Sequence, residues 1–378
     1  MLARLIARDF RNFASLDIEV PPEGLVIIGE NGHGKTNLLE AVAYLGLLRS
    51  FRGARDADVV RFGATAFHVR ARLTPPSAYD SVSLGYDRSA KRKRATLDGV
   101  EQPRLTAALG ALPSVEFSPA DVALVTGGPA ERRHYLDVVL ALSSRSYLLA
   151  LQQYRAALVQ RNAALRLAQR DAGRGTAHEA RVSIWEPALA EHGGVVVAAR
   201  QHFVQQHRAR FSELSAQIGE RVPVSIRYAG GSPHDGAAET GSATASSATA
   251  AYLQAYAQQR PTEIRRGTTL IGPHRDDLQI GLGGRDLRTF GSAGQQRSAA
   301  IALRLVELAA LRETLDYPPL LLLDDPFAEL DLGRAARVLS LLDEAGAAQV
   351  LLAVPREEDI PAAFTRLARR TMCDGGLT

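Results

Sequence analysis

The sequence predicts an α/β protein whose main lobe is built from both ends of the chain, with a helical arm inserted between them. Three observations lead to this fold class. A glycine-rich loop at residues 29–34 stands between an apolar run and a helical pattern, and a second apolar run, at 320–323, ends in two aspartates. Between these two segments, residues from about 117 to 259 mostly space their apolar positions as helices do.

The glycine-rich loop has the residues of a phosphate-binding site. It comprises Gly29, Glu30, Asn31, Gly32, His33, Gly34, Lys35, Thr36 and Asn37. The run 25–28 before it is a predicted strand, and residues 37–44 after it have helical spacing. Glycines let the backbone turn tightly and present its N–H groups, and the N-terminus of a helix adds partial positive charge. We therefore predict that Lys35 contacts the β and γ phosphates of a nucleotide and that Thr36 ligates Mg²⁺.

Residue usage supports this role for Lys35. The chain has 45 Lys and Arg residues, of which only Lys35, Lys91 and Lys93 are lysine. A compact ammonium on a flexible stem fits a phosphate loop better than a planar guanidinium does.

Composition and charge exclude several classes of protein. With 378 residues and 46% hydrophobic residues, the chain is large enough for two domains or for one domain with a large insertion. No apolar run approaches the length of a membrane span, and charged residues within 1–20 argue against a secretory signal, so we expect a cytoplasmic protein with no membrane partner. The single cysteine, Cys373, excludes an internal disulfide framework.

The first third of the chain contains predicted strands at 2–6, 16–20, 25–28 and 66–73. Arg11 lies in the turn between the first two predicted strands. Two roles remain open for it: a side chain that folds back toward the nucleotide phosphates, or an ordinary polar turn residue. The sequence alone favours the second role. A further hairpin carries the basic cluster 91–94 at its tip. Contact with a nucleic-acid backbone and simple solvation explain that cluster equally well.

The predicted arm contains helices at 131–142, 147–170 and about 185–218. Their apolar positions do not keep a heptad long enough for an extended coiled coil. Residues 230–250 are rich in Gly, Ser, Thr and Ala, and we expect a mobile loop there.

The last third returns to alternating helices and strands. A helical segment covers 297–314, and the buried-strand run 320–323 ends in Asp324 and Asp325. We expect Asp324 to bind the metal beside the phosphate loop and Asp325 to polarise the attacking water. Asp331 is a predicted N-cap for a helix at 333–342, and a strand at 349–354 completes the core.

Taken together and in order, these motifs resemble the split ATP-binding-cassette heads of SMC-type DNA repair and chromosome proteins, and within that group the RecF family of bacterial gap-repair proteins. The resemblance covers most of the chain. It rests on RN at 11–12, the loop 29–37, RSFR at 49–52, FSPAD at 117–121, GPAERR at 128–133, QRN at 160–162, GPHRDD at 272–277, SAGQQ at 292–296 and DDPFAELD at 324–331.

The resemblance implies an ABC-type, SMC-head-like ATPase lobe formed by residues 1–115 and 262–378, with a helical arm at 116–261. It also implies that Ser292, Gly294 and Gln295 belong to a signature segment that caps the ATP held by a second subunit. A helix N-terminus suits that task, although Ser292 as a simple helix cap is compatible with the same residues.

The function implied by the resemblance is ATP-dependent DNA binding in recombinational repair and replication-fork maintenance. Its expected ligands are ATP and Mg²⁺. Its expected partners are duplex DNA with single-strand gaps, a second copy of the chain, and RecR- and RecO-type mediators that help to load the recombinase RecA. An ABC-type transporter subunit and an SMC-like structural tether are the alternatives; the helical insertion is too long for the first and too short for the second.

Three departures from the broader cassette pattern predict slow hydrolysis and therefore a switch. No glutamine lies between Asn31 and Glu101, so the metal-sensing glutamine has no named equivalent, and residues 118–121 occupy its place. Asp325 stands where a catalytic glutamate is usual, and the switch position near 353–355 has no histidine. Residues 274–277 form either a salt-bridged turn that supports the signature segment, which we favour, or a direct contact to nucleotide or DNA.

Overall fold

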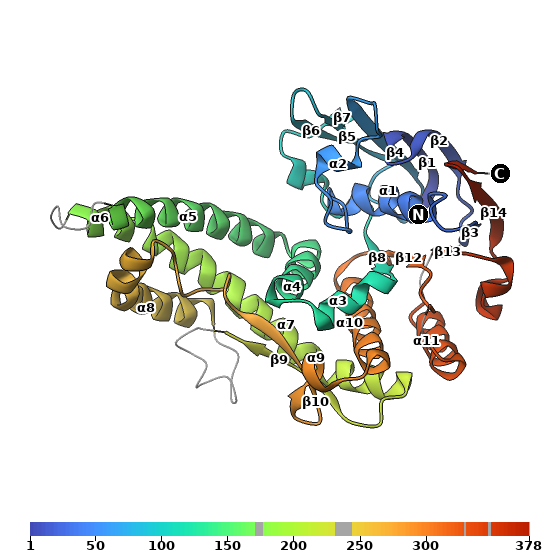
Figure 1. Ribbon diagram of the computed structural model, residues 1–378. Coiled ribbons are helices and arrows are strands. Elements are labelled where there is room, and N and C mark those ends of the chain that lie inside the picture. Colours follow the sequence, from blue (N-terminus) through green and yellow to red (C-terminus); the bar gives the residue numbers. More distant parts are fainter. Residues whose placement is uncertain (171–176, 231–243, 329, 347–348, 378) are drawn as a thin grey trace. The chain divides into compact units, whose positions relative to one another are not determined.

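The computed structural model describes residues 1–170, 177–230, 244–328, 330–346 and 349–377. The chain forms two compact units (Figure 1). Unit 1 is Met1–Asp121 with Ile301–Thr378, and unit 2 is Val122–Ala300. The return to the first unit therefore comes at residue 301 and not at the expected 262. The segment between those positions pairs its strands with a strand of the arm, which keeps it in unit 2.

Unit 1 contains two six-stranded sheets. The first is antiparallel in the order β2-β1-β4-β5-β6-β7, and the second has the order β15-β14-β3-β13-β12-β8. The strands of the first sheet are β1 Leu2–Phe10, β2 Phe13–Glu19, β4 Ala66–Leu73, β5 Ser81–Asp87, β6 Arg92–Leu97 and β7 Val100–Glu101. Those of the second are β3 Gly24–Ile28, β8 Ser114–Phe117, β12 Leu320–Asp324, β13 Val350–Val354, β14 Ala368–Cys373 and β15 Gly376–Leu377.

In the second sheet, strands from the two ends of the chain lie side by side. Strand β13 pairs in parallel with both β3 and β12, and β14 pairs in parallel with β3 (Figure 1). Parallel strands carry their carboxyl ends to one edge of a sheet. The loop after β3 and the aspartates after β12 therefore meet at that edge, and the prediction that the first and last parts of the chain fold as one lobe is correct.

Helix α1 Lys35–Leu47 is the centre of the core of unit 1. It packs against strands of both sheets, and ten of its residues are buried. Phe10, Tyr44 and Phe67 meet edge to face between α1 and the first sheet, with ring centroids 5.3–5.8 Å apart. Such aromatic contacts add to the burial of apolar surface. The remaining α-helices described in this unit are α2 Asp56–Val59 and α11 Leu332–Glu344, and the long helix α10 Ala293–Thr314 begins in unit 2 and ends in unit 1.

Unit 2 is mainly helical, as predicted. Its helices are α3 Ala123–Thr126, α4 Pro129–Ser143, α5 Arg145–Arg170, α6 Ala177–Ser183, α7 Glu186–Ile218, α8 Ala245–Arg266 and α9 Leu287–Phe290. In Figure 1, α5, α7 and α8 run beside one another, and they pack together in the structure. None of the described helices is long and apolar enough to cross a membrane.

Unit 2 also contains a three-stranded sheet that the helical prediction for 117–259 missed. Its order is β11-β10-β9, formed by β9 Val224–Ala229, β10 Asp277–Leu282 and β11 Arg285–Asp286. Buried and exposed residues alternate along β9, with Val224, Ile226 and Tyr228 buried. A strand of six residues is too short to stand out beside long helical segments, although this alternation is its signal.

The prediction of a mobile loop at 230–250 is wrong for the C-terminal end of that range. Residues 231–243 lie outside the described residues. Thr244 then caps helix α8, because its hydroxyl accepts a hydrogen bond from the backbone N–H of Ser247. Small residues such as those at 245–250 are compatible with a helix, and alanine favours one.

Candidate nucleotide site

The loop between β3 and α1 has the backbone of an anion site. Gly34 is the N-cap of α1 with φ at 113°, and no side chain caps the helix. A Cβ atom at this position would lie 2.6 Å from Nδ2 of Asn12, so both conformation and space require glycine. The first N–H groups of α1 therefore have no side-chain acceptor, and with the helix dipole they favour an anionic ligand.

Lys35 lies across this loop. Its Nζ donates hydrogen bonds to the backbone oxygens of Gly29 at 2.5 Å and Glu30 at 3.0 Å. Burial lowers the pKa of Lys35, while Asp324 and Asp325 act in the opposite direction. The ammonium is thus held at the loop by carbonyl oxygens, which are weak enough partners for a phosphate oxygen to replace.

Thr36 and Asp324 meet although 288 positions separate them in the sequence. The Thr36 hydroxyl lies 2.8 Å and 3.0 Å from the two carboxylate oxygens of Asp324. Burial raises the pKa of Asp324, and the Thr36 hydrogen bond and the Lys35 charge oppose that rise. A hydroxyl and a carboxylate are hard oxygen donors of the kind that Mg²⁺ binds together with substrate phosphates.

The described residues contain no group of three or more His, Cys, Asp or Glu side chains that could hold a metal without such help. The pair Thr36 and Asp324 fits a magnesium ion whose remaining ligands are phosphate oxygens and water, which is the usual arrangement for this metal.

Asp325 occupies a special backbone position directly after β12. Its φ is 45°, in the left-handed region, which aspartate tolerates better than most residues. Its N–H donates to the backbone oxygen of Ala353 at 2.9 Å. Its carboxylate is close enough to Lys35 and Asp324 to affect the pKa of both. Asp325 thus lies at the carboxylate end of the site, where its role as the water-polarising group remains a proposal.

Asn12 and Arg52 contact the predicted loop residue Asn37 and extend the site by two residues that sequence reasoning did not assign to it. Asn12 Nδ2 donates to the backbone oxygen of His33 at 3.1 Å, and Asn37 Nδ2 donates to Asn12 Oδ1 at 2.8 Å. Arg52 then donates to Asn37 Oδ1 at 3.2 Å. Two of these residues belong to the segments 11–12 and 49–52 that carried the family resemblance, and that was the available signal.

Arg11 is engaged differently from its expected contact with the nucleotide. Its guanidinium makes a two-pronged ion pair with Glu40 on α1, at 2.6 Å and 2.8 Å, and also donates to the backbone oxygen of Asp58 at 3.3 Å. The Glu40 side chain is fully buried and needs a cation beside it. The structure therefore places Arg11 as the partner of a buried carboxylate, a role that neither of the two alternatives above described.

Ser292, Gly294 and Gln295 belong to unit 2 and begin helix α10. Ser292 Oγ accepts from the backbone N–H of Gln295 at 3.3 Å, while Gln295 Oε1 accepts from the N–H of Ser292 at 3.0 Å. This reciprocal pair is a capping box. Ser292 thus has a cap partner of its own, although its exposed hydroxyl retains an O–H group to donate.

The polar group 274–277 forms a network inside unit 2. Asp277 accepts two hydrogen bonds from Arg132, both at 2.8 Å, and Asp276 accepts one from the Tyr228 hydroxyl at 2.7 Å. His274 lies 2.5 Å from the Tyr154 hydroxyl, and burial lowers its pKa to about 4. These contacts fit the salt-bridged turn, and they join α4, α5 and the small sheet.

Residues 118–121, which stand in place of the glutamine loop, are also engaged. Asp121 accepts from the Ser118 N–H at 2.7 Å and from Arg304 at 2.7 Å and 3.1 Å. A carboxylate occupied by an arginine is a poor metal ligand. The segment has a structural role in unit 1, and it supplies no substitute for the missing glutamine.

The predicted basic hairpin is present as β5 and β6, and its cations are mostly paired. Lys93 lies 2.6 Å from Asp56 and 5.2 Å from the centre of the Tyr44 ring, while Arg92 and Arg94 lie within 4 Å of Glu101. Lys93 is therefore a structural cation. The hairpin tip alone has less free charge than the sequence suggested.

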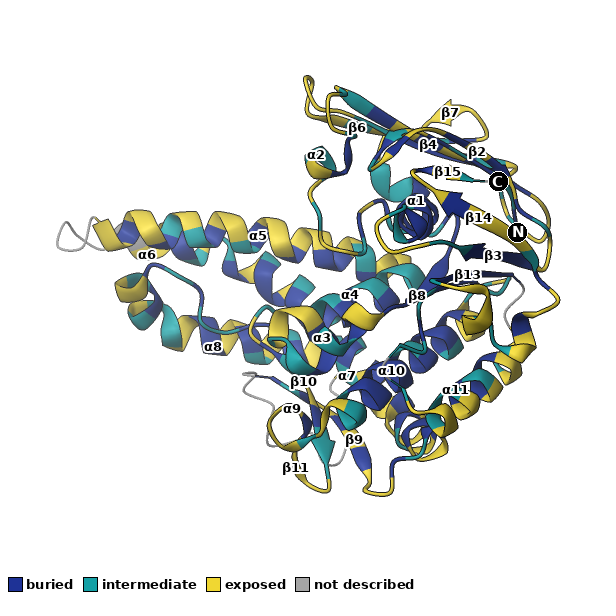
Figure 2. Cartoon of the chain, turned by 45° about the vertical axis from the view of Figure 1, so that its right-hand side comes forward, coloured by how far each residue is buried: buried dark blue, intermediate teal, exposed yellow. Residues whose placement is uncertain are grey.

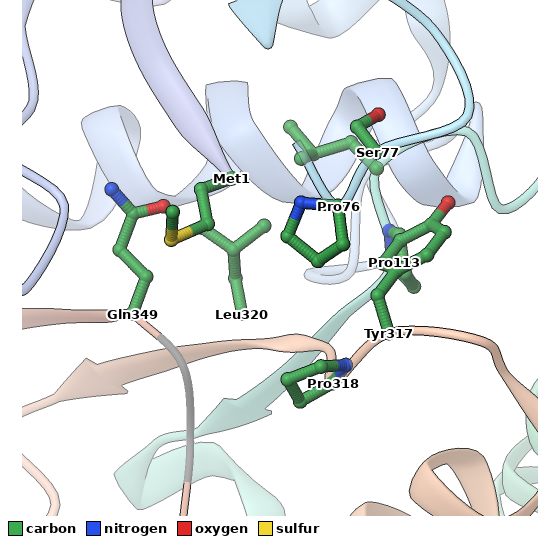
Figure 3. A pocket seen from close by; sticks show the side chains of 9 residues that line it. Met1, Pro76, Ser77, Pro113, Tyr317, Pro318, Leu320 and Gln349 are labelled. Carbon is green, nitrogen blue, oxygen red and sulfur yellow. The ribbon is translucent and has the colours of Figure 1, made fainter. Parts of the chain in front are cut away.

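Another pocket of unit 1 lies apart from these residues (Figure 3). Its lining includes no charged side chain and no residue of the phosphate loop. It is formed by Met1, Pro76, Ser77, Leu112, Pro113, Tyr317, Pro318, Leu320 and Gln349. It lacks the cations and oxygen ligands that a nucleotide requires.

Comparison with known proteins identifies the family to which this chain belongs. The family model of the RecF/RecN/SMC N-terminal domain matches residues 1–377. The DNA replication and repair protein RecF of Frankia alni is 37% identical over 368 residues, covering 96% of each chain. The protein of the same name from Moorella thermoacetica is 36% identical over 374 residues, covering 98% of this chain and 93% of the relative.

Solved structures give the same result. The structure of the recombination mediator protein RecF with ATP, from the RecFOR pathway, has a TM-score of 0.88 and 28% identity, covering all of this chain and 96% of the other. An Smc head bound to the C-terminal winged-helix domain of ScpA has a TM-score of 0.54 at 15% identity, which supports the ABC-type head fold alone. The chain therefore belongs to the RecF/RecN/SMC N-terminal domain family of ABC-type ATPases, and within it to the RecF group of DNA replication and repair proteins.

Proposed function

We propose that this chain binds and slowly hydrolyses ATP with Mg²⁺, pairs with a second copy when ATP is bound, and holds duplex DNA near single-strand gaps during recombinational repair. The observation that carries the proposal is the contact between the Thr36 hydroxyl and Asp324, which joins the phosphate loop to the end of β12. The similar structure of RecF with ATP and the names of the relatives support the nucleotide and the repair role.

In this proposal the loop residues 29–37 bind the polyphosphate. Lys35 exchanges its two carbonyl contacts for phosphate oxygens, and the uncapped N-terminus of α1 supplies backbone N–H donors. Magnesium, held by Thr36 and Asp324, would neutralise charge on the phosphates. Arg11 acts indirectly, by holding the buried Glu40 on α1.

Asp325 is the candidate group that accepts a proton from the attacking water. Its backbone is constrained at φ 45°, and aspartate is shorter than the glutamate usual in cassette ATPases. A carboxylate with shorter reach positions water less closely, and general-base catalysis depends on hydrogen-bond distance. We therefore propose slow turnover, suited to a switch in which ATP holds a dimer and hydrolysis releases it.

Dimerisation is proposed to bring Ser292, Gly294 and Gln295 of one subunit to the ATP of the other. The capping box leaves the Ser292 O–H free to donate while Oγ serves the helix. The start of α10 then offers a hydroxyl donor, backbone N–H groups and the helix dipole to a γ-phosphate. Each site is complete only when two copies meet.

We further propose that the DNA-bound dimer cooperates with RecR- and RecO-type mediators to load recombinase. The similar solved structures are of RecF as a recombination mediator protein in the RecFOR pathway, which supports this part of the proposal.

The mass of the protein in solution tests the proposal, measured without nucleotide, with ADP and with ATP, each with and without a gapped duplex. We expect a dimer only with ATP and Mg²⁺, and slower dissociation of that dimer on DNA. A monomer under all conditions would refute ATP-gated pairing. Removal of Mg²⁺ with EDTA is the matched control, since ATP without the metal should not support the dimer.

A further inference from the structure

The outer face of the first sheet of unit 1 carries a cluster of cations. Along β4, Phe67, Val69 and Ala71 are buried against the core, so the alternating residues His68, Arg70 and Arg72 point away from it and are exposed. This alternation along the strands is visible in Figure 2. On the neighbouring strand β1, Arg8 lies directly opposite His68. We call Arg8, His68, Arg70 and Arg72 the basic face.

Three arginines of the basic face make no ion pair of their own. In the part of the chain that the structure describes, Arg8, Arg70 and Arg72 have no carboxylate partner within 4 Å, although the charge of Arg8 acts, after the Arg4 hydrogen bond, to lower the pKa of Asp17. Partial burial lowers the pKa of His68, and the nearby charges of Arg70 and Arg8 act in the same direction.

A different arrangement on the same strands provides a contrast. Arg4 also lies on β1, directly opposite Arg72, but it makes an ion pair with Asp17 on β2 at 2.6 Å. Arg4 is thus held by a carboxylate of its own sheet, whereas Arg8, Arg70 and Arg72 have no such ion pair among the described residues. Ion pairing within the sheet therefore does not account for these three arginines.

The surroundings of the basic face fit a charged and extended ligand. On the next strand, β5, the small residues Ser83 and Gly85 lie opposite Arg70 and His68, and Arg94 on β6 lies opposite Gly85. The cations thus flank a row of small residues on a sheet surface, with neighbouring strands about 4.8 Å apart. A backbone of phosphates could approach such a surface without meeting bulky side chains.

The residue types favour nucleic acid over a protein partner. Protein interfaces have a core of aromatic and apolar side chains. On this side of β1 and β4 the one large apolar residue is Ile6, which is half-buried, so the face lacks such a core. Arginine binds phosphate through two parallel hydrogen bonds.

We propose that the basic face, with Arg8, Arg70 and Arg72 as its principal contacts, binds the phosphodiester backbone of duplex DNA. This inference rests on the proposed function, since it assigns the DNA surface that the function requires. It also gives a role to Arg94 of the basic hairpin, which continues the same row of residues across the sheet.

The test uses the triple variant Arg8→Gln/Arg70→Gln/Arg72→Gln of the full chain. Binding to a fluorescent gapped duplex is measured by anisotropy with ATP and Mg²⁺, at salt concentrations from roughly 50 to 200 mM. Loss of three phosphate contacts should reduce the slope of log affinity against log salt by about 2.7, and should weaken binding about 100-fold at physiological salt. The corresponding triple lysine variant keeps the charge and should recover most of the affinity.

The matched control removes three exposed arginines from unit 2, in Arg227→Gln/Arg285→Gln/Arg288→Gln, so that net charge falls by the same amount. We expect this control to bind DNA within a few-fold of the wild type. Equal weakening of both triple variants would mean that only net charge matters, and would overturn the assignment.

Three further outcomes separate this inference from the proposed function. If the wild type binds DNA and the basic-face variant binds equally well, the surface is wrong while the function stands. If that variant instead loses only its binding to polyglutamate, the face serves an acidic protein. If the wild type binds no DNA in any nucleotide state, both fail. ATP-dependent dimerisation and the melting temperature should be unchanged in the basic-face variant, because its substitutions lie on an exposed surface and break no ion pair between described residues.

Discussion

Replacement of Arg11 by alanine separates a structural role for this residue from a role in nucleotide binding. Its guanidinium pairs with Glu40, whose side chain is fully buried, while the Arg11 side chain is 18% exposed. Arg11→Ala would leave Glu40 with two remaining partners. These are the Ser50 hydroxyl and the more distant Arg52, 3.6 Å away.

The magnitude follows from the burial of that carboxylate. Breaking a buried ion pair by removing one partner typically costs 3–5 kcal/mol, because the other charge stays buried without compensation. Ser50 and Arg52 retain part of the stabilisation, so we expect about 3 kcal/mol. For a domain of about 200 residues, the size of unit 1, this corresponds to a fall in melting temperature of roughly 6–12 °C.

The assay is calorimetry of Arg11→Ala, Glu40→Gln and the double variant, followed by titration of each with ATP. We expect Arg11→Ala to destabilise unit 1 most and the double variant to recover much of the loss, since a neutral amide is cheaper to bury than an unpaired carboxylate. ATP affinity of the double variant should then stay near that of the wild type. A stable double variant with strongly weakened ATP binding would refute the structural role and restore a direct phosphate contact.

Three further predictions concern the nucleotide site and the core. Lys35→Arg should keep part of the ATP affinity but lose at least about 100-fold in turnover and lose ATP-dependent dimerisation, because a planar guanidinium cannot replace the ammonium in the loop. Phosphate-release kinetics and the mass in solution check these two losses. Ser292→Arg should bind ATP normally and remain monomeric, whereas Ser292→Ala should lower the stability of the fold by only about 1 kcal/mol through the lost helix cap. A Ser292→Arg variant that still dimerises with ATP would contradict capping across subunits. Burial raises the pKa of Glu116 to about 7 from an ordinary 4.5, so its contribution to stability is fully present below pH 4.5 and is lost as pH rises through 7. Chemical denaturation should show that fall, of about 1–3 kcal/mol, and Glu116→Gln should remove it.

The sequence predicted those parts of the site that local pattern determines. A loop rich in glycine between an apolar strand and a helix located Lys35 and Thr36, and a strand ending in carboxylates located Asp324. Their meeting was predictable because buried parallel strands place their carboxyl ends at one edge of a sheet. The same kind of pattern located helices α5, α7 and α10 to within a few residues.

The partners of Arg11 and Asp121 were not predictable in this way. Arg11 pairs with Glu40, and Asp121 pairs with Arg304, 183 positions away. Nothing in the local sequence distinguishes a carboxylate that will be buried beside an arginine from one that will be solvated or bound to a metal. Such pairs depend on which helix faces are brought together by the fold.

The turn between β1 and β2 connects two features of unit 1 that the sequence presented separately. Its Asn12 side chain donates to the backbone oxygen of His33 in the phosphate loop, and strand β1 leads from this turn to Arg8 on the basic face. Arg11 in the same turn holds Glu40 on α1, the helix that begins at the loop. A displacement of the loop at His33 must therefore either break the Asn12 hydrogen bond or move the end of β1. Because β1 pairs with β4 along most of its length, movement of that end would alter the spacing of the cations that we propose for DNA contact. The turn thus links the proposed nucleotide site to the proposed DNA surface within unit 1, and this link does not involve the helical arm.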